Sequence, residues 1–337
     1  MTERKLRIRE IPDVVRQGRR QCLMLLGTTA AAVAIGRPAY AQRKTAIRIV
    51  IPFTPGGPTD LIGRVVAQHL ENAWGQPVVA ENKPGAGSSI GAQFVSRATP
   101  DGNTLLLTAS SHIMSAPLLP DLPYDPVADF TPLSIAGFQP FVLTVAASDK
   151  ITDLAGFLDM ARKTSEPISL GVAGIGNGSH YAGLMMQRAQ RDLRFLFVPY
   201  TGSSQVVTSL LSGQVRTVFL NTTVAIPLIQ SGRARALAVT SPLRWRQLPS
   251  VPTLAQSGFP GFDCSAWYGF LGPAGMPPTL IERLDHDLRA ALDAPDAIRS
   301  ISNAGLDPLH WTPAEFGSHM REEYARWRSL IADAGYS

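Results

Sequence analysis

The sequence predicts an α/β fold of mainly parallel sheets with flanking helices, arranged as two lobes with a cleft between them. Short β-branched apolar runs alternate with helical patterns through most of the 337 residues, and this alternation is typical of strand–helix–strand units. A proline-rich segment, Pro117–Pro132, and a second segment, Gly258–Pro278, interrupt the alternation. We expect the chain to cross between lobes near these segments, since it is long enough for two lobes of ordinary domain size.

The first 41 residues predict a cleavable export signal. A basic segment ending in Arg19 and Arg20 precedes an uncharged, mostly apolar run, Leu23–Gly36, and an Ala-x-Ala cleavage signal ends at Ala41. A transmembrane anchor is the alternative, but it needs roughly 20 apolar residues, and this run is shorter. The arginine pair is compatible with the twin-arginine route or with general secretion.

Removing the leader changes what the charge and cysteine content imply. The leader holds eight of the 31 Lys and Arg and three of the 26 Asp and Glu, so the remaining chain is electrically balanced. A basic surface for nucleic acid is therefore not expected. Only Cys264 remains, which excludes an intrachain disulfide and a cysteine metal cluster.

Hydrophobic periodicity predicts the elements in chain order. Strands are expected at Ile47–Pro52, Val78–Glu81, Thr104–Thr108, Val142–Ala146, Ser169–Ala173, Phe195–Val198, Thr217–Leu220 and Arg235–Thr240. Helices are expected at Thr59–Trp74, Ser88–Arg97, Leu154–Lys163, Ser179–Arg191, Ser203–Leu211, Pro278–Ala294 and Pro313–Ala334. If the chain crosses near Ile135–Ala147 and returns near Ser265–Gly272, residues 42–143 and 267–337 form lobe 1, and residues 144–266 form lobe 2. A cleft between lobes is a favoured place for a small ligand.

The loop from Phe53 to Asp60 has the composition of an anion-binding loop. It follows the first strand and opens directly into a helix, whose N-terminal N–H groups and dipole attract negative charge. Gly56 and Gly57 permit close backbone approach, and Thr59 or Asp60 suits a helix N-cap. An ordinary strand–helix turn could have the same composition, so the residues alone leave both alternatives open.

A second loop of the same kind follows the strand Ser169–Ala173. Its glycines at 174, 176 and 178 approach a dinucleotide-binding fingerprint, but that fingerprint requires a glycine where Ser179 stands. We therefore expect no nicotinamide cofactor. Neither loop contains Lys or Arg, so a carboxylate here would be held by backbone N–H groups, hydroxyls and helix dipoles.

No arrangement of side chains predicts catalysis or a metal site. Ser89 lies in a G-x-S-x-G pattern, but a nucleophile elbow needs its serine directly at a strand-to-helix turn, and the preceding strand is expected to end near Glu81. The six histidines form no i, i+4 metal pair. The aromatic group at Trp267, Tyr268 and Phe270 is interpreted as core. We expect no enzyme activity; an exported serine hydrolase using Ser89 is the alternative.

Several stretches after the leader match those of a known family and occur in the same order as in that family. They read IVIPFTPGGPTD, VVAENKPGAGSSIGA, ATPDGNTLLL, LPYDPVADFTPL, GVAGIGNGSHYAG, FVPYTGSSQVVTSLLSGQV, RARALAVTS, LPSVPTLAQSGFPGF and WYGFLGPAGMP. The sequence resembles the Bug family of periplasmic solute receptors, which serve tripartite tricarboxylate transporters. The resemblance implies a two-lobed periplasmic binding protein of type II topology that closes over a small carboxylate.

The resemblance also implies the ligand-binding residues and the partners. Lobe 1 would supply Phe53, Thr54, Gly56, Gly57 and Asp60, with Ser110 and Ser111 on the hinge side. Lobe 2 would supply Gly176, Asn177, Gly178, Ser179, His180, Tyr200 and Asn221. The implied partners are a small organic carboxylate and membrane transporter subunits, or a membrane sensor protein if the receptor signals instead. The receptor is expected to be a periplasmic monomer.

Two departures from the family pattern bear on specificity. The family often has Asp before the asparagine at 221, where this chain has Leu220, and a basic residue after the tyrosine at 200, where this chain has Thr201. A less charged wall in lobe 2 favours a ligand with an uncharged distal end. We therefore expect a monocarboxylate or an aromatic acid rather than a tricarboxylate.

Overall fold

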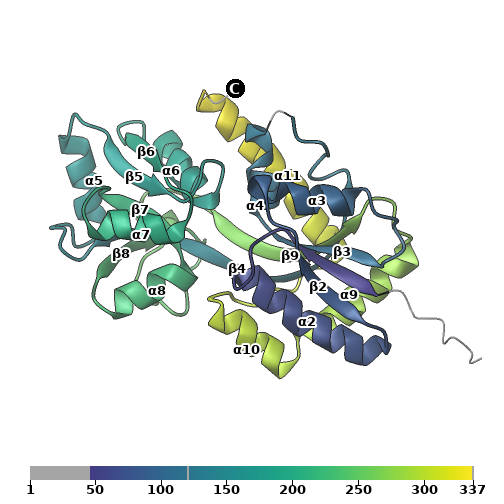
Figure 1. Cartoon of the computed structure of the whole chain (residues 1–337). Coiled ribbons are helices and arrows are strands. Elements are labelled where there is room, and N and C mark those ends of the chain that lie inside the picture. The colour runs from purple at the N-terminus through teal and green to yellow at the C-terminus, as the bar shows by residue number, and fades with distance from the viewer. Residues whose placement is uncertain (1–45, 120, 336–337) are drawn as a thin grey trace, which may run out of the picture. The chain divides into compact units, whose positions relative to one another are not determined.

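A computed structural model describes residues 46–119 and 121–335 (Figure 1). The predicted export leader, residues 1–41, lies outside the described residues. None of the described helices is both long enough and apolar enough to cross a membrane.

The chain begins with alternating strands and helices. In order these are β1 (Ile47–Ile51), α2 (Pro58–Trp74), β2 (Val78–Asn82), the 3₁₀ turn η2 (Ala86–Ser88), α3 (Ser89–Ser96), β3 (Thr104–Ala109), α4 (Ser111–Met114), η3 (Ala116–Leu118) and the long strand β4 (Phe130–Ala146). Glycine and proline residues separate several of these elements, as in the turn between β1 and α2.

The middle of the chain continues the alternation, and the last third is mainly helical. The elements are α5 (Leu154–Lys163), β5 (Ile168–Val172), α6 (Gly178–Ala189), β6 (Phe195–Pro199), α7 (Ser203–Leu211), β7 (Thr217–Asn221), α8 (Thr222–Gln230), β8 (Ala234–Val239), η4 (Ala255–Ser257), β9 (Ser265–Pro273), α9 (Pro278–Leu292), α10 (Pro295–Asn303) and α11 (Pro313–Asp333).

The strands run in the order β2-β1-β3-β9-β4-β7-β5-β6, and β8 also pairs with β4. The pairs β1–β2, β1–β3, β5–β6 and β5–β7 are parallel. Every pair that includes β4 or β9 is antiparallel. The α/β class is as predicted, but the expectation of mainly parallel sheets holds only away from the two central strands.

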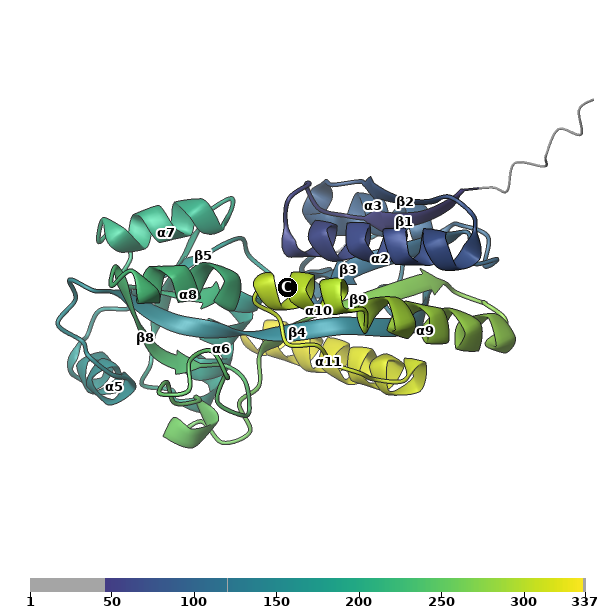
Figure 2. The ribbon, with the colours of Figure 1, turned by 90° about the horizontal axis from the view of Figure 1, so that it is seen from below.

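Strand β4 runs through both halves of the strand order (Figure 2). Its residues Phe130–Pro140 pair with β9, and Phe141–Ala146 pair with β7 and β8. The sequence predicted only the last five residues of β4 and none of β9. The missed part of β4 contains prolines, which strands tolerate mainly at edges and bulges, and its pairing with β9 shifts register near Pro132. The predicted lobe boundaries remain predictions.

The strands form a first sheet, made of β1, β2, β3, β9 and Phe130–Pro140 of β4, and a second sheet, made of β5, β6, β7, β8 and Phe141–Ala146 of β4. Helices cover both faces of each sheet and bury four apolar clusters. In the first sheet, α2 and α9 pack on one face and α3 with the first half of α11 on the other. In the second sheet, α5 and α6 cover one face, and α7 and α8 cover the other. The second half of α11, including Trp327 and Leu330, packs into the same cluster as α6. Helix α11 therefore contacts the cores of both sheets.

Candidate ligand-binding cleft

A cavity of about 390 Å³ opens between the loops of the two sheets. It is lined by Phe53, Thr54, Gly57, Pro58, Thr59, Ala109, Ser110, Ser111, Met114, Phe141, Ala173, Asn177, Gly178, Ser179, Gly202, Ser203, Phe219, Leu220, Asn221, Ala266 and Tyr268. We call this cavity the cleft. Its volume lies within the ordinary range for small-molecule sites.

Four helices begin at the wall of the cleft. The N-cap residues of α2, α6, α7 and α8 are Gly57, Asn177, Gly202 and Asn221, and all four line the cavity. This convergence follows from topology, because α2, α6 and α7 each start where a parallel strand has ended, at the edge where open α/β sheets bind ligands. The positive ends of four helix dipoles therefore meet at one cavity.

The four N-termini differ in how their backbone N–H groups are satisfied. Asn177 Oδ1 accepts a hydrogen bond from the His180 N–H at 3.1 Å, and Asn221 Oδ1 accepts from the Val224 N–H at 3.2 Å. Gly57 and Gly202 have no side chain that could cap α2 or α7. The first turns of α2 and α7 thus retain donors for a bound anion.

The described lining of the cleft contains no Lys, Arg, His, Asp or Glu. Hydroxyl groups come from Thr54, Thr59, the serines and Tyr268, and amide groups from Asn177 and Asn221. Apolar surface comes from Phe53 after β1 and from Phe141, Phe219 and Leu220 of the second sheet. A ligand's negative charge would therefore be balanced by helix N-termini and neutral donors, with apolar contacts for the rest of the molecule.

Tyr268 belongs to a buried polar network at the hinge side of the cleft. Its hydroxyl oxygen lies 2.7 Å from Gln139 Nε2, and Gln139 Oε1 lies 2.7 Å from the Thr222 hydroxyl. Burial raises the pKa of Tyr268 to about 12, so its hydroxyl stays protonated. The network joins β9, β4 and α8 directly behind the cavity.

Asp60 holds the first loop from behind and does not line the cleft. Its carboxylate accepts hydrogen bonds from the Gly56 N–H at 2.9 Å, from Arg64 at 3.0 Å and from Asn82 at 3.0 Å. Burial acts to raise the pKa of Asp60, but Arg64, the Gly56 N–H and Asn82 together hold that pKa below its ordinary value. Asp60 therefore positions the loop as a charged anchor.

His180, Gly176 and Tyr200 also lie outside the cavity lining. His180 is fully buried, accepts from the Gly176 N–H at 3.3 Å and meets Phe197 edge-to-face, and burial lowers its pKa to about 4. The Tyr200 ring packs beside Gly171 of β5. His180 and Gly176 therefore support the loop after β5, and Tyr200 supports the loop after β6, without lining the cavity.

The structure brings most of the predicted site residues to one cavity. Those on its lining are Phe53, Thr54, Gly57, Ser110, Ser111, Asn177, Gly178, Ser179 and Asn221, and those outside its lining are Gly56, Asp60, Gly176, His180 and Tyr200. As ligand contacts, all of them remain predictions. Sequence reasoning missed Phe141, Gly202, Ser203, Ala266 and Tyr268 among others. The Gly-Ser-Ser stretch before α7 is a helix-start signal that could have indicated Gly202 and Ser203.

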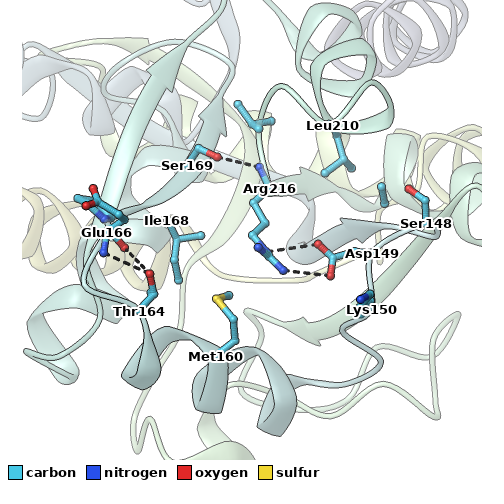
Figure 3. A pocket seen from close by; sticks show the side chains of 14 residues that line it. Ser148, Asp149, Lys150, Met160, Thr164, Glu166, Ile168, Ser169, Leu210 and Arg216 are labelled. Atoms are coloured by element: carbon cyan, nitrogen blue, oxygen red, sulfur yellow. Dashed lines mark hydrogen bonds and ion pairs between the residues drawn. The ribbon is translucent and has the colours of Figure 1, made fainter.

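A second hollow, of about 610 Å³, lies at the opposite edge of the second sheet. Arg216 and Asp149, both on its lining, form an ion pair with a nitrogen–oxygen distance of 3.3 Å (Figure 3). Ile168 and Arg216 stand at the amino ends of β5 and β7, whereas ligands of open α/β sheets bind at the carboxyl ends. This hollow is therefore not the candidate site.

Ser89 does not occupy a nucleophile elbow. Strand β2 ends at Asn82, and the turn η2, with Gly87 and Ser88 at positive φ, intervenes before α3 begins at Ser89. Across the described part of the chain, no group of three or more His, Cys, Asp and Glu residues is placed to hold a metal ion.

A family model described as "Tripartite tricarboxylate transporter family receptor" matches residues 62–336. The chain belongs to this family. A protein from the tcbD–tcbE intergenic region of Pseudomonas sp. strain P51 is 34% identical over 96% of each chain. BugT of Bordetella pertussis is 31% identical over 93% of this chain and 97% of its own. Because the family consists of solute receptors, the prediction that the chain is not an enzyme is confirmed.

Solved structures of similar proteins have the same fold. The periplasmic binding protein BugD superposes with a TM-score of 0.73 at 31% identity, covering 88% of this chain and 99% of that one. A Rhodopseudomonas palustris protein solved with adipate gives 0.74 at 29% identity, over 88% and 98%. MatC from the same organism, with bound malate, gives 0.72 at 28% identity, over 87% and 100%. The predicted two-lobed periplasmic binding protein fold is thereby confirmed.

Proposed function

We propose that the chain is a periplasmic receptor that binds a small carboxylate in the cleft and delivers it to a tripartite membrane transporter. The observation that carries this proposal is the convergence of four helix N-termini on a cavity whose described lining has no charged side chain. N-terminal N–H groups carry positive partial charge, and each hydrogen bond to a charged group contributes about 1.5–3 kcal/mol. Such a cavity favours an anion.

The lining also bears on the kind of carboxylate. Phe141, Phe219 and Leu220 add apolar surface, and no lysine or arginine of the described lining could pair with a second or third carboxylate. We infer that the ligand is a monocarboxylate or an aromatic acid. The adipate and malate in related structures support an organic acid in general.

Delivery to a transporter rests on membership of the receptor family. A periplasmic location is supported by the predicted export leader and by the fold shared with the periplasmic binding protein BugD. If the chain is a receptor, it should bind its ligand without converting it to a product.

The ligand class can be tested by thermal unfolding of residues 42–337 with mono-, di- and tricarboxylates, aromatic acids and amino acids. A ligand at 100 times its Kd stabilises the folded state by about 2.7 kcal/mol, which raises Tm by several degrees. We expect the shift to be confined to monocarboxylates and aromatic acids, with the ligand recovered unchanged. Shifts from tricarboxylates alone would overturn the proposed ligand class.

A variant at the start of α7 tests the charge argument. Ser203 is the first residue of α7 and lines the cleft. Because aspartate at a helix N-terminus adds about 0.3–1 kcal/mol of stability, Ser203→Asp should keep or raise Tm. Its charge should nevertheless repel a bound carboxylate and weaken binding at least about tenfold, or roughly 1.4 kcal/mol.

Two controls separate charge from shape in this experiment. Ser203→Asn changes the shape in nearly the same way without charge, and Ser204→Asp places the charge on the next, exposed residue outside the lining. Both should bind the carboxylate much more tightly than Ser203→Asp, as measured by calorimetry. Equal affinity of Ser203→Asp and the parent would refute a carboxylate held by these N-termini.

A further inference from the structure

A third pocket, of about 460 Å³, lies on the other face of the two central strands. Successive side chains of a strand point to opposite faces, so Ala266 and Tyr268 of β9 line the cleft, whereas Ser265 and Trp267 line this pocket. We call it the back pocket. It shares strands with the cleft but no lining residue.

Aromatic side chains form much of the wall of the back pocket. Phe138, Trp245, Trp267 and Trp311 all line it, and Phe138 meets Trp245 edge-to-face at 5.6 Å. Such faces accommodate an apolar body, and they also attract a cation through the quadrupole of the ring. The described lining of the cleft, by contrast, contains no tryptophan.

Most charged groups of the back pocket are already paired with one another. Glu323 is buried, accepts from the Trp267 indole N–H at 2.7 Å and lies 3.5 Å from Arg326 and from His319. Arg246 pairs with Asp307. Paired in this way, Arg246 and Arg326 add little net positive charge to the pocket.

Asp263 is the acidic residue of the pocket without an ion-pair partner among the described residues. Its carboxylate accepts one hydrogen bond from the Ser265 hydroxyl at 2.9 Å. Burial raises the pKa of Asp263 and outweighs the opposing effects of the Ser265 hydrogen bond and of the charges on Arg326 and His319, neither of which lies close enough to form an ion pair with it. Arg244, at the exposed rim, bonds to Gln256 and to the Pro249 carbonyl instead.

We propose that the back pocket binds a small organic cation, with its ammonium group at Asp263 and its apolar body among the tryptophans. The volume suits a small molecule, the walls suit an apolar body, and the partly buried carboxylate supplies the countercharge that an ammonium needs. This site differs from the cleft in place and in the sign of the charge it selects.

Benzylammonium is a suitable probe, with tryptophan fluorescence as the readout, because three of the five tryptophans line the pocket. We expect saturable quenching by benzylammonium and at least about tenfold weaker binding of neutral benzyl alcohol. Asp263→Asn keeps an acceptor for Ser265 and should lower the affinity for benzylammonium by a similar factor. Asp192→Asn removes the same charge at an exposed position outside the pocket and should leave the affinity unchanged.

Three outcomes would overturn the proposal: no saturable response to benzylammonium, equal binding of benzyl alcohol, or unchanged affinity in Asp263→Asn. Thermal unfolding of each variant reports whether it is folded. Should Asp263→Asn not fold, Trp311→Leu provides the second test, since loss of one aromatic wall should also weaken benzylammonium binding. Carboxylate binding in the cleft is measured separately, so failure of either proposal is distinguishable from failure of the other.

Discussion

Two buried histidines, His112 and His180, make the stability of the folded state sensitive to acid. His112 and His180 are buried, and burial lowers the pKa of each to about 4 from an ordinary value of 6.5. Between these values the unfolded chain binds protons that the folded chain does not, so stability is complete above pH 6.5 and falls as the pH decreases. Asp60 matters only at lower pH. Its pKa is lowered in the folded state, so its ionised form stabilises the fold, and this stabilisation is lost as the pH falls below the ordinary value of 3.8.

The variant His112→Gln should reduce this acid sensitivity. His112 Nε2 lies 2.9 Å from the Pro126 carbonyl, a hydrogen bond that a glutamine amide can also donate. Each histidine should lower the free energy of unfolding by about 1.6 kcal/mol between pH 6.5 and pH 5. The variant should therefore lose about 1.6 kcal/mol less stability than the parent over this range. Urea unfolding at the two pH values measures the difference. An identical pH dependence in the variant and the parent would show that His112 does not titrate as its burial implies.

At the scale of elements, the start of α6 depends on a glycine packed against β4. A Cβ atom on Gly178 would stand 2.2 Å from the Phe141 ring, and both residues line the cleft. Only a residue without a side chain lets the N-terminus of α6 approach the Phe141 ring so closely. The position of the α6 N-terminus in the cleft wall therefore depends on its packing against Phe141 of β4.

Gly178→Ala should displace α6 or Phe141 and weaken carboxylate binding at least about tenfold, with some loss of stability from overpacking, about 1–3 kcal/mol. Calorimetric titration and thermal unfolding measure the two effects. Gly156→Ala in the first turn of α5 is the matched control, since its Cβ would have 3.4 Å to the nearest atom and should leave affinity unchanged. Parent-like affinity in Gly178→Ala would mean that this N-terminus does not help to hold the ligand.

At the scale of the whole described molecule, an ion pair lies on the face of the central strands opposite the cleft. Arg246, in a loop after β8, pairs with Asp307, in the segment after α10, and both line the back pocket. If the lobes close over the cleft by bending β4 and β9, groups on the opposite face of these strands should separate. The Arg246–Asp307 pair would then favour the form described here over a closed form.

Arg246→Ala should therefore raise carboxylate affinity slightly, by a factor of about two to five, because exposed ion pairs contribute only about 0.2–1 kcal/mol. The control Arg162→Ala breaks the exposed Arg162–Asp159 pair within α5 and should leave affinity unchanged. Titration calorimetry on both variants decides the point. Weaker binding in Arg246→Ala would show that the pair supports the ligand-bound form instead.

Local patterns in the sequence were sufficient to predict the strands and helices that flank the loops of the cleft. The strands before Phe53 and Gly174 and the starts of α2, α6 and α7 were all placed within about two residues, because apolar periodicity and helix-start residues are local signals. The same approach missed β9, most of β4, α8 and α10. Prolines and glycines in β4 and β9 concealed two strands that are stabilised by pairing with distant segments.

By itself the sequence determined the α/β class, the two glycine-containing loops before helices and the absence of Lys and Arg from them, since each depends on residue type and spacing along the chain. Only the tertiary structure decided which residues meet at the cavity. It placed Gly202, Ser203 and Tyr268 on the lining and left Asp60, His180 and Tyr200 outside it. Neighbours in sequence face opposite ways on strands and helices, so a motif identifies a loop, whereas packing and strand register decide which of its side chains reach the ligand.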